Sequence, residues 1–321
     1  MALSRLLASR IQISRLFGLL AGLLAASLSP PAAQSAPVAD PPPEQAAATA
    51  PGKDWVRIRR DPQGKPLALE VAIVRYVPAQ NAKRKSQWAN QYVDLVGAIH
   101  IADHSYYQQL NKRFRQYDAM LYELVAPEGT VVPRGRGTSN LNPLGAMQNG
   151  MSSMLELEHQ LEQIDYTRPN FVHADFSPEE FMRSMENRDE GFLKLYFRII
   201  GQAVAQQSQQ AAHDESSDLD LFTALLSKDR PRKLKIAMAK QFESMESVLM
   251  GFSGPAGSTL ITERNKRALK VLRQQQAAGK RKLAIFYGAG HLSDMHQRLV
   301  TEFGLKPVEV TWVKAWDLSG K

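Results

Sequence analysis

The chain of 321 residues contains no cysteine. Disulfide bonds, thiolate zinc sites, iron–sulfur clusters, a cysteine nucleophile and a lipidated N-terminal cysteine are therefore all excluded. A long basic block is also missing, because the formal charge of +8 comes from 40 basic and 32 acidic residues spread along the chain. A dedicated nucleic-acid binder carries a concentrated basic stripe, so we do not expect nucleic acid as a partner.

The longest apolar run near the N-terminus, Leu16 to Leu28, is too short for a comfortable membrane span. Three arginines precede this run and small residues follow it around Ala33 to Ala36, which is the order of a secretory signal. Residues 1–36 are therefore predicted to be a signal peptide, or a signal anchor if they are not cleaved. We expect an exported protein, periplasmic or secreted, that contacts a membrane only through an uncleaved N-terminal segment.

Residues 37–53 continue a run of proline, alanine and polar residues that begins at Ser29. This composition buries too little apolar surface to offset the entropy lost on ordering, so the segment is predicted to be a linker. The remaining residues, 54–321, are predicted to form the folded domain. Its composition is that of an ordinary globular protein, with 44% hydrophobic and 22% charged residues in the whole chain.

Two parts of the domain share one order of strand, helix and strand. The first unit comprises the apolar run 92–101, which is predicted to contain a strand and a tight glycine-containing turn, then a helix capped by Asp103 that runs to Tyr117, and strand 118–125. The second unit comprises strand 282–287, helix 291–303 and strand 308–313. Strand–helix–strand units favour parallel, right-handed pairing. The sequence therefore predicts an α/β fold in which two pseudo-repeated βαβ units form a central sheet, preceded by a hairpin of residues 55–59 and 67–77.

The residues between the units, 126–281, are predicted to form a large helical insert. The expected helices are 147–163, 178–188, 192–209, 219–226, 232–250 and 259–276, with a polar loop at 213–220. The insert is rich in methionine. Methionine at helical spacing is typical of core packing, or of an adaptable wall that receives an extended or lipidic substrate.

His100 and His291 each lie three positions after a glycine, between a predicted strand and a predicted helix. Ligands of open parallel sheets gather beyond the carboxyl ends of the strands, so both imidazoles can face one pocket if the units pack side by side. Glu123, near the end of the next strand, can point to the same rim. Two imidazoles and one carboxylate form a common ligand set for a hydrolytic metal. Each residue alone is more often structural or solvated, and only the repeated context favours a site.

Four short motifs match a known family in order and spacing. They are GAIH (97–100), YELV (122–125), ERN (263–265) and GAGHL (288–292). Together they resemble the TraB/PrgY/Tiki group, over roughly residues 91–128 and 257–316. That group is related in fold to erythromycin-esterase-like and ChaN-like proteins, and its Tiki branch is similar to a metal-dependent protease.

The resemblance implies an exported, metal-dependent, peptidase-like hydrolase that acts on a peptide or another small exported substrate. His100, Glu123 and His291 would be its catalytic metal ligands, holding manganese, cobalt or zinc. Arg264 would clamp an anion or oxyanion, and Asn265 would be an orienting hydrogen-bond donor. The alternative for this last pair is a solvated position at a helix N-terminus.

Other functions fit the same residues. A non-catalytic exported protein could capture a peptide or haem in this pocket, and an interaction module could dock a partner on the helical insert. The segment GAGHLS lacks the third glycine of a dinucleotide fingerprint, and no HExxH helix is present. The single E-x-x-H of Glu156 to His159 favours a solvent-facing helix, and Asp103 and Asp294 are predicted to be helix caps. The sequence does not indicate an oligomeric state.

Overall fold

The computed structural model describes residues 52, 54–79, 91–132, 155–188, 227, 229–240 and 257–320. The chain separates into two compact units, residues 1–41 with 191–237 and residues 42–190 with 238–321. Every candidate site residue belongs to the second unit. Within the part of the chain that is described, no helix is long and apolar enough to cross a membrane.

Several predicted segments lie outside the described residues. They are the signal at 1–36, almost all of the linker at 37–53, the helices at 192–209 and 219–226, and the loop at 213–220. Residues 230–240 are helical and overlap the first part of the helix predicted for 232–250, whose residues 241–250 lie outside the described part of the chain.

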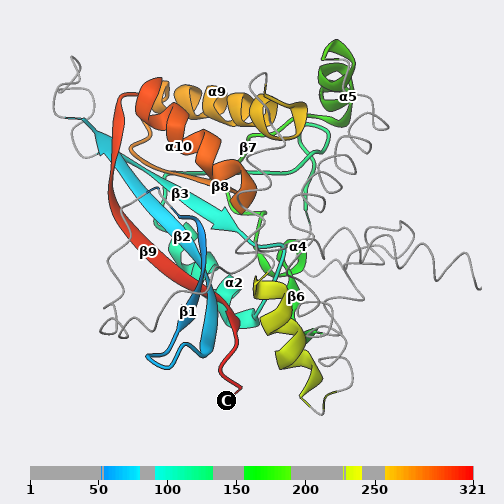
Figure 1. Cartoon of the computed structure of the whole chain (residues 1–321). Helices are drawn as coiled ribbons and strands as arrows, with labels where there is room; N and C mark the ends of the chain where they lie inside the picture. The colour runs from blue at the N-terminus through cyan, green and yellow to red at the C-terminus, as the bar shows by residue number, and fades with distance from the viewer. Residues whose placement is uncertain are drawn as a thin grey trace, which may run out of the picture. The chain divides into compact units, whose positions relative to one another are not determined.

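The elements of the second unit follow in the order shown in Figure 1. They are β1 (Val56–Arg60), β2 (Pro66–Pro78), β3 (Tyr92–Ala98), β4 (Ile101–Ala102), α2 (His104–Phe114), β5 (Ala119–Tyr122), β6 (Glu158–His159), α4 (Gln160–Gln163), β7 (Phe171–His173), α5 (Pro178–Asn187), the π-turn η1 (Thr259–Glu263), α9 (Arg264–Ala277), β8 (Lys282–Gly288), the 3₁₀ turn η2 (Ala289–His291), α10 (Leu292–Thr301) and β9 (Leu305–Asp317).

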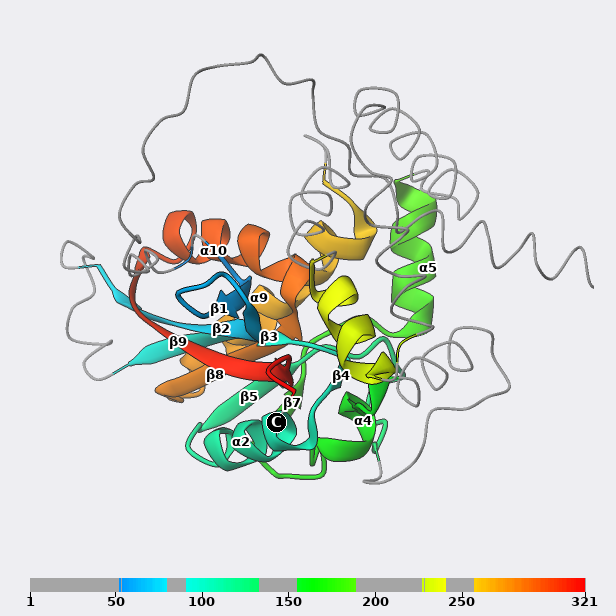
Figure 2. The same cartoon turned by 60° about the horizontal axis from the view of Figure 1, so that its bottom comes forward.

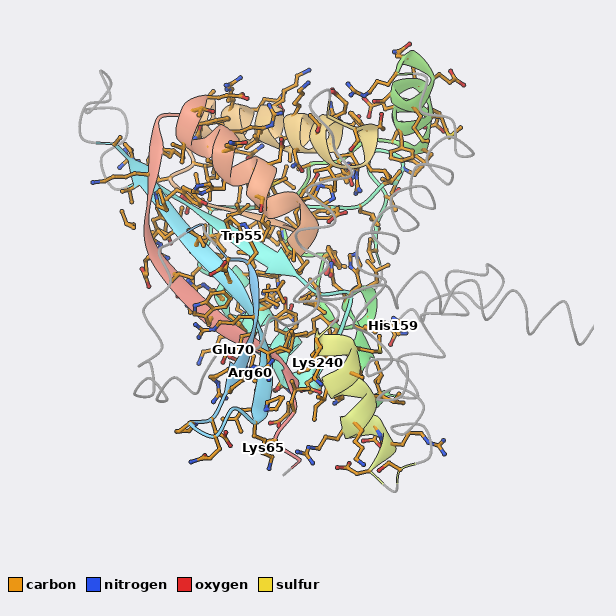
Figure 3. All side chains as sticks on the ribbon, viewed as in Figure 1. Trp55, Arg60, Lys65, Glu70, His159 and Lys240 are labelled. Atoms are coloured by element: carbon orange, nitrogen blue, oxygen red, sulfur yellow. The ribbon has the colours of Figure 1, made fainter. Side chains whose placement is uncertain are left out.

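The central sheet has seven strands in the order β1-β2-β3-β8-β5-β7, with β9 on β2. Strands β3, β8, β5 and β7 are parallel, whereas β2 is antiparallel to its neighbours β1, β3 and β9. The predicted α/β class and the predicted β1–β2 hairpin are therefore confirmed. In Figure 3, Glu70 marks this hairpin, where its carboxylate accepts hydrogen bonds from Arg57 and Arg59 at 2.9 and 2.8 Å.

The two predicted βαβ units interleave instead of packing side by side. Strand β8 lies between β3 and β5, and β9 pairs with β2 and not with β8. The reason lies in their side chains. Residues 283–287 of β8 are all buried, so this strand needs cover on both faces and takes a central place. Strand β9 mixes charged and apolar residues, which suits an edge with one solvated face.

The insert at 126–281 is not wholly helical. Strand β7 pairs with β5 and adds one strand to the sheet, and β6 with the short α4 takes the place of the last part of the helix predicted for 147–163. Three-residue and two-residue strands are too short to show a periodicity. The helices predicted for 178–188 and 259–276 are present as α5 and as η1 with α9.

Helices cover both faces of the sheet, with α9 and α10 on one side and α2 on the other (Figure 2). Successive side chains of β8 therefore pack against opposite helix layers. Ile285 and Tyr287 belong to the core beneath α9 and α10, while Phe286 packs against Phe114 of α2 with ring centroids 5.0 Å apart. Both helix layers are thus anchored to the strands whose ends carry the site.

The two motif glycines have different roles. Gly97 lies inside β3, where a side chain would collide with Val71, whereas Gly288 is the last residue of β8. The predicted glycine-containing turn within 92–101 therefore does not begin at Gly97, which belongs to the strand itself. Asp103 stands at the N-cap position of α2 but does not cap the helix with its side chain. Its carboxylate accepts the backbone N–H of Asp317 at 2.5 Å and so joins α2 to the end of β9.

Candidate active site

Four parallel strands end at one edge of the sheet, and each is followed by a polar residue. His100 follows β3, Glu123 follows β5, Asp175 follows β7, and His291 follows β8 through η2. Helix α9 begins at Arg264 on the same side of the sheet. Its first two residues contact three of the four: Arg264 contacts Asp175 and Glu123, and Asn265 contacts His291. The edge predicted from the sequence is therefore the place where the polar side chains gather.

Glu123 is the centre of this group. One carboxylate oxygen accepts the backbone N–H of Gly288 at 2.6 Å, and the other accepts from Arg264 at 2.7 Å. His291 Nε2 lies 3.5 Å from that second oxygen. Burial alone would raise the pKa of Glu123, but the charge that His291 carries when it is protonated, the charges of Arg264 and His100, and the Gly288 N–H lower it to about 2. Glu123 is therefore a carboxylate at neutral pH.

Arg264 is fixed by Asp175, a residue that the sequence analysis missed. Asp175 is fully buried and accepts two hydrogen bonds from the guanidinium, at 2.9 and 2.5 Å. Burial alone would lower the pKa of Arg264, but the hydrogen bond to Asp175 and the charge of Glu123 hold it above its ordinary value. A signal existed in the sequence, because Asp175 stands between the short run Phe171–His173 and the helix start at Ser177, as the other site residues stand between strand and helix.

Asn265 sets the protonation of His291. Its side-chain N–H₂ donates to Asp294 at 2.8 Å and to the His291 carbonyl at 3.1 Å, and both of these partners can only accept. Its carbonyl oxygen must therefore face His291 Nδ1, which lies 2.7 Å away and donates its hydrogen. In the neutral ring the lone pair is then on Nε2, the atom nearest Glu123. Asp294 accordingly supports Asn265 and is not the helix cap that the sequence predicts.

His291 and Glu123 thus turn two acceptor atoms toward each other across 3.5 Å. Burial lowers the pKa of His291, and the charge of Glu123 offsets only part of that effect, so a proton between the two atoms is disfavoured. Two ligands of one tetrahedral ion with bonds of 2.0–2.1 Å lie about 3.4 Å apart. The pair therefore fits two positions around one small divalent cation.

His100 lies on the wall of a cavity that also contains Glu123 and Arg264. The cavity measures about 200 Å³, and Leu124, Val125 and Leu161 form its apolar side. His100 Nδ1 is 3.1 Å from the side-chain oxygen of Gln160, whose N–H₂ donates to Tyr166 at 2.8 Å.

His159 also belongs to the wall of this cavity. It is 7% exposed, and its Nε2 is buried and has no hydrogen-bond partner among the described residues. It lies in β6, opposite Ile101 of β4, so the prediction of a solvent-facing helix at this E-x-x-H segment is wrong (Figure 3).

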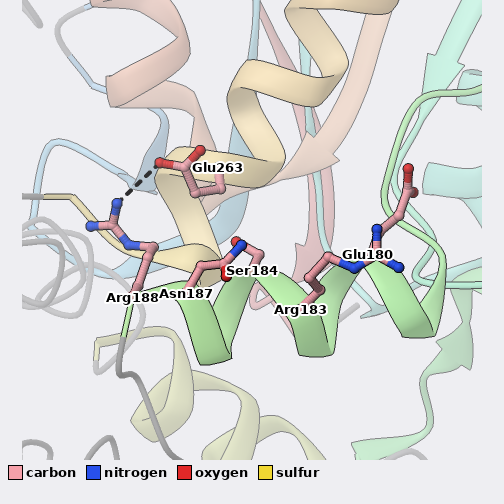
Figure 4. A pocket seen from close by; sticks show the side chains of 6 residues that line it. All are labelled: Glu180, Arg183, Ser184, Asn187, Arg188 and Glu263. Carbon is pink, nitrogen blue, oxygen red and sulfur yellow. Dashed lines mark hydrogen bonds and ion pairs between the residues drawn. The ribbon is translucent and has the colours of Figure 1, made fainter.

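A second hollow, of about 330 Å³, lies along α5 and the π-turn η1 (Figure 4). Ser184 of α5 contacts Thr259 at 3.0 Å, and Arg188 pairs with Glu263 at 3.2 Å and donates to the carbonyl of Gly257 at 2.7 Å. These contacts brace the turn that leads directly into Arg264. π-Turns are frequent at functional sites. Here the turn directly precedes Arg264 and Asn265, two adjacent residues that contact different partners.

Four of the five predicted site residues are therefore joined by direct contacts, namely Glu123, Arg264, Asn265 and His291. His100 shares the cavity, but within the described part of the chain it forms no hydrogen bond with Glu123 or His291. Among the residues that the structure describes, no three His, Asp or Glu side chains form a group that could hold a metal ion as they stand. Comparison of the chain with protein-family models, with curated proteins and with solved structures found no match.

Proposed function

We propose that this protein is an exported, metal-dependent hydrolase, peptidase-like in its chemistry, with His100, Glu123 and His291 as its metal ligands. One observation carries the proposal: the Nε2 lone pair of His291 faces the Glu123 carboxylate at the spacing of two ligands of one ion. His100 lines the same cavity and would complete the set. When bound, manganese, cobalt or zinc supplies the Lewis acidity that activates water and polarises a carbonyl.

The protein's own groups have distinct tasks in this proposal. Glu123, an anion that faces the cavity, attracts the cation. Asn265 keeps the proton of His291 on Nδ1, so that Nε2 is free to bind. Arg264 stays charged and holds Glu123 in place, and its position on the cavity wall allows it to stabilise negative charge that develops on the substrate.

The cavity favours hydrolysis of a small group over haem capture. Its volume of about 200 Å³ is below the roughly 300–1,000 Å³ of sites for drug-sized ligands. The apolar residues Leu124, Val125 and Leu161 suit one small aliphatic side chain or acyl group beside the reacting carbonyl. We therefore infer a peptide or ester with an aliphatic group next to the scissile bond.

The test is metal content and hydrolysis by the purified protein. We expect close to one manganese, cobalt or zinc ion per chain, and cleavage of aliphatic members of a peptide and ester panel that stops when a chelator is added. His100→Ala, Glu123→Ala and His291→Ala should each lose both the metal and the activity.

His104→Ala is the matched control. His104 is half exposed, its Nδ1 lies 2.6 Å from a carboxylate oxygen of Glu158, and it does not line the cavity. It should keep both properties. A well-folded wild-type protein that neither binds metal nor turns over any substrate would rule out the hydrolase. In that case, a Soret band on adding haem, or peptide binding without cleavage, would support the alternative of ligand capture.

A further inference from the structure

A chain of hydrogen bonds continues behind the site from His291 to the surface of α10. His291 Nδ1 contacts Asn265 at 2.7 Å, Asn265 donates to Asp294 Oδ2 at 2.8 Å, and Arg298 donates to the same oxygen at 2.8 Å. A second hydrogen bond from Arg298, of 3.2 Å, reaches the other oxygen of Asp294. Asp294 therefore receives donors from two sides, and one of them is the amide that determines how His291 is protonated.

Asn265 is fully buried, so its amide must satisfy both its donor and its acceptor within the protein. A side-chain amide can be turned over, which exchanges its oxygen and its nitrogen at almost no steric cost. The Asp294 carboxylate allows only one of the two orientations, because it can accept a hydrogen bond but cannot donate one. The His291 carbonyl adds a longer bond of 3.1 Å in the same sense.

We infer that Asp294 is a positioning residue that locks the Asn265 amide and, through it, holds His291 in the Nδ1–H tautomer with Nε2 free toward Glu123. Its importance for catalysis rests on the proposed function, but the tautomer itself does not. Hydrogen-bond partners behind a ligand histidine, which fix its tautomer and its ring orientation, are a common feature of metal sites. Asp294 performs this task from α10, one turn beyond the histidine that it controls.

Arg298 allows the role of Asp294 to be tested by substitution. If Asp294 were replaced by leucine, the guanidinium of Arg298 would lose both hydrogen bonds to that carboxylate and would be left beside the Asn265 amide. A cationic donor there favours the opposite amide orientation, in which the N–H₂ group of Asn265 faces the ring. His291 Nδ1 would then have to accept, and the proton would move to Nε2.

The test uses the full-length protein with ¹⁵N-labelled histidine and long-range ¹H–¹⁵N correlation spectra near neutral pH. The signals that His291→Gln removes identify the ring. Wild type should contain His291 with its hydrogen on Nδ1 alone. Asp294→Leu should populate the Nε2–H tautomer, and Asp294→Asn, which keeps the shape of the side chain, should show a mixture of both.

Glu302→Gln is the matched control. Glu302 is the other carboxylate that pairs with Arg298, at 2.7 Å, and it does not contact Asn265. This variant should keep the wild-type tautomer. A His291 that carries its hydrogen on Nε2 in wild type, or that stays wholly Nδ1–H in both Asp294 variants, would overturn the inference. The asparagine variant decides the matter if the leucine variant does not fold.

Zinc affinity, measured by competition with a chromogenic chelator, gives a second result. Loss of an outer partner of a ligand histidine weakens metal binding by roughly 10- to 100-fold, which is the effect expected for both Asp294 variants. Glu302→Gln should bind zinc as wild type does. If the wild-type protein binds none of manganese, cobalt or zinc, the proposed function fails, and the tautomer measurement alone decides the role of Asp294.

Discussion

Gly288 donates its backbone N–H to Glu123 at 2.6 Å, and a Cβ atom at position 288 would lie 3.3 Å from the same carboxylate oxygen. The absence of a side chain therefore lets the end of β8 approach the carboxylate closely. The backbone of Gly288 has φ −48° and ψ 140°, which alanine also adopts, so space and not conformation requires glycine here.

Gly288→Ala should fold but disturb the site. The carboxylate must shift by a few tenths of an ångström, so we expect a loss of unfolding free energy within about 1 kcal/mol and zinc binding about 10-fold weaker. Gly97→Ala is the contrasting variant, because its new methyl group would press on Val71 inside the core. It should lose about 1–3 kcal/mol and keep its zinc affinity. Urea unfolding measures the loss of stability, and chelator competition measures the zinc affinity. Equal zinc affinities in both variants would contradict the role of Gly288 in placing Glu123.

Asp175→Asn should damage both stability and function. Breaking a buried ion pair costs about 3–5 kcal/mol, because the remaining charge is left uncompensated. Asp94→Asn is a matched control: Asp94 is also fully buried and also accepts two hydrogen bonds from one arginine, Arg75, at 2.8 and 2.9 Å.

Both aspartate variants should lower the urea midpoint by similar amounts, but only Asp175→Asn should lose hydrolysis and weaken zinc binding. Equal activity losses in the two would mean that Asp175 contributes through stability alone.

Acid should weaken the fold through Glu123. Its pKa is about 2 in the folded protein and 4.5 ordinarily, so its contribution is complete above pH 4.5 and disappears as the pH falls toward 2. The expected size is on the order of 3 kcal/mol. The pKa of Asp317 is also lowered to about 2, so Asp317 contributes to the same loss of stability in acid. The contribution of Glu123 is therefore measured as the difference in unfolding free energy between the wild type and a Glu123 variant at each pH. Glu123→Gln should show a shallower loss of stability between pH 4.5 and 2.5 in urea titrations.

Glu128→Gln, at an exposed position five residues further on, should follow the wild-type pH curve. If Glu123→Gln also followed that curve, the lowered pKa of Glu123 would be refuted.

Gln160→Leu should affect His100 selectively. Gln160 is buried and joins His100 Nδ1 to Tyr166, so leucine removes the group that orients the imidazole. We expect zinc affinity to fall about 10-fold with His291 unaffected in ¹⁵N spectra. Gln109→Leu, on the exposed face of α2, is the control. Unchanged zinc binding in Gln160→Leu would remove His100 from the ligand set.

Local sequence determined the elements on which this site is built. The apolar runs at 92–98 and 282–288, the hairpin before them and the helices at 178–187 and 264–277 all follow from periodicity and capping, which act between near neighbours. The positions of His100, Glu123 and His291 at strand ends follow from the same patterns, and so does the α/β class. These features need no knowledge of which strand lies beside which.

Only the tertiary structure decided which side chains meet. It placed β8 between β3 and β5 and so brought Gly288 to Glu123, and it joined Arg264 to Glu123 across 141 positions of the chain. It also gave Asp175 and Asp294 their partners. Contacts at such separations depend on strand order and helix packing, which leave no local periodicity in the sequence. The strand ends were therefore predictable, whereas the network that orients their side chains was not.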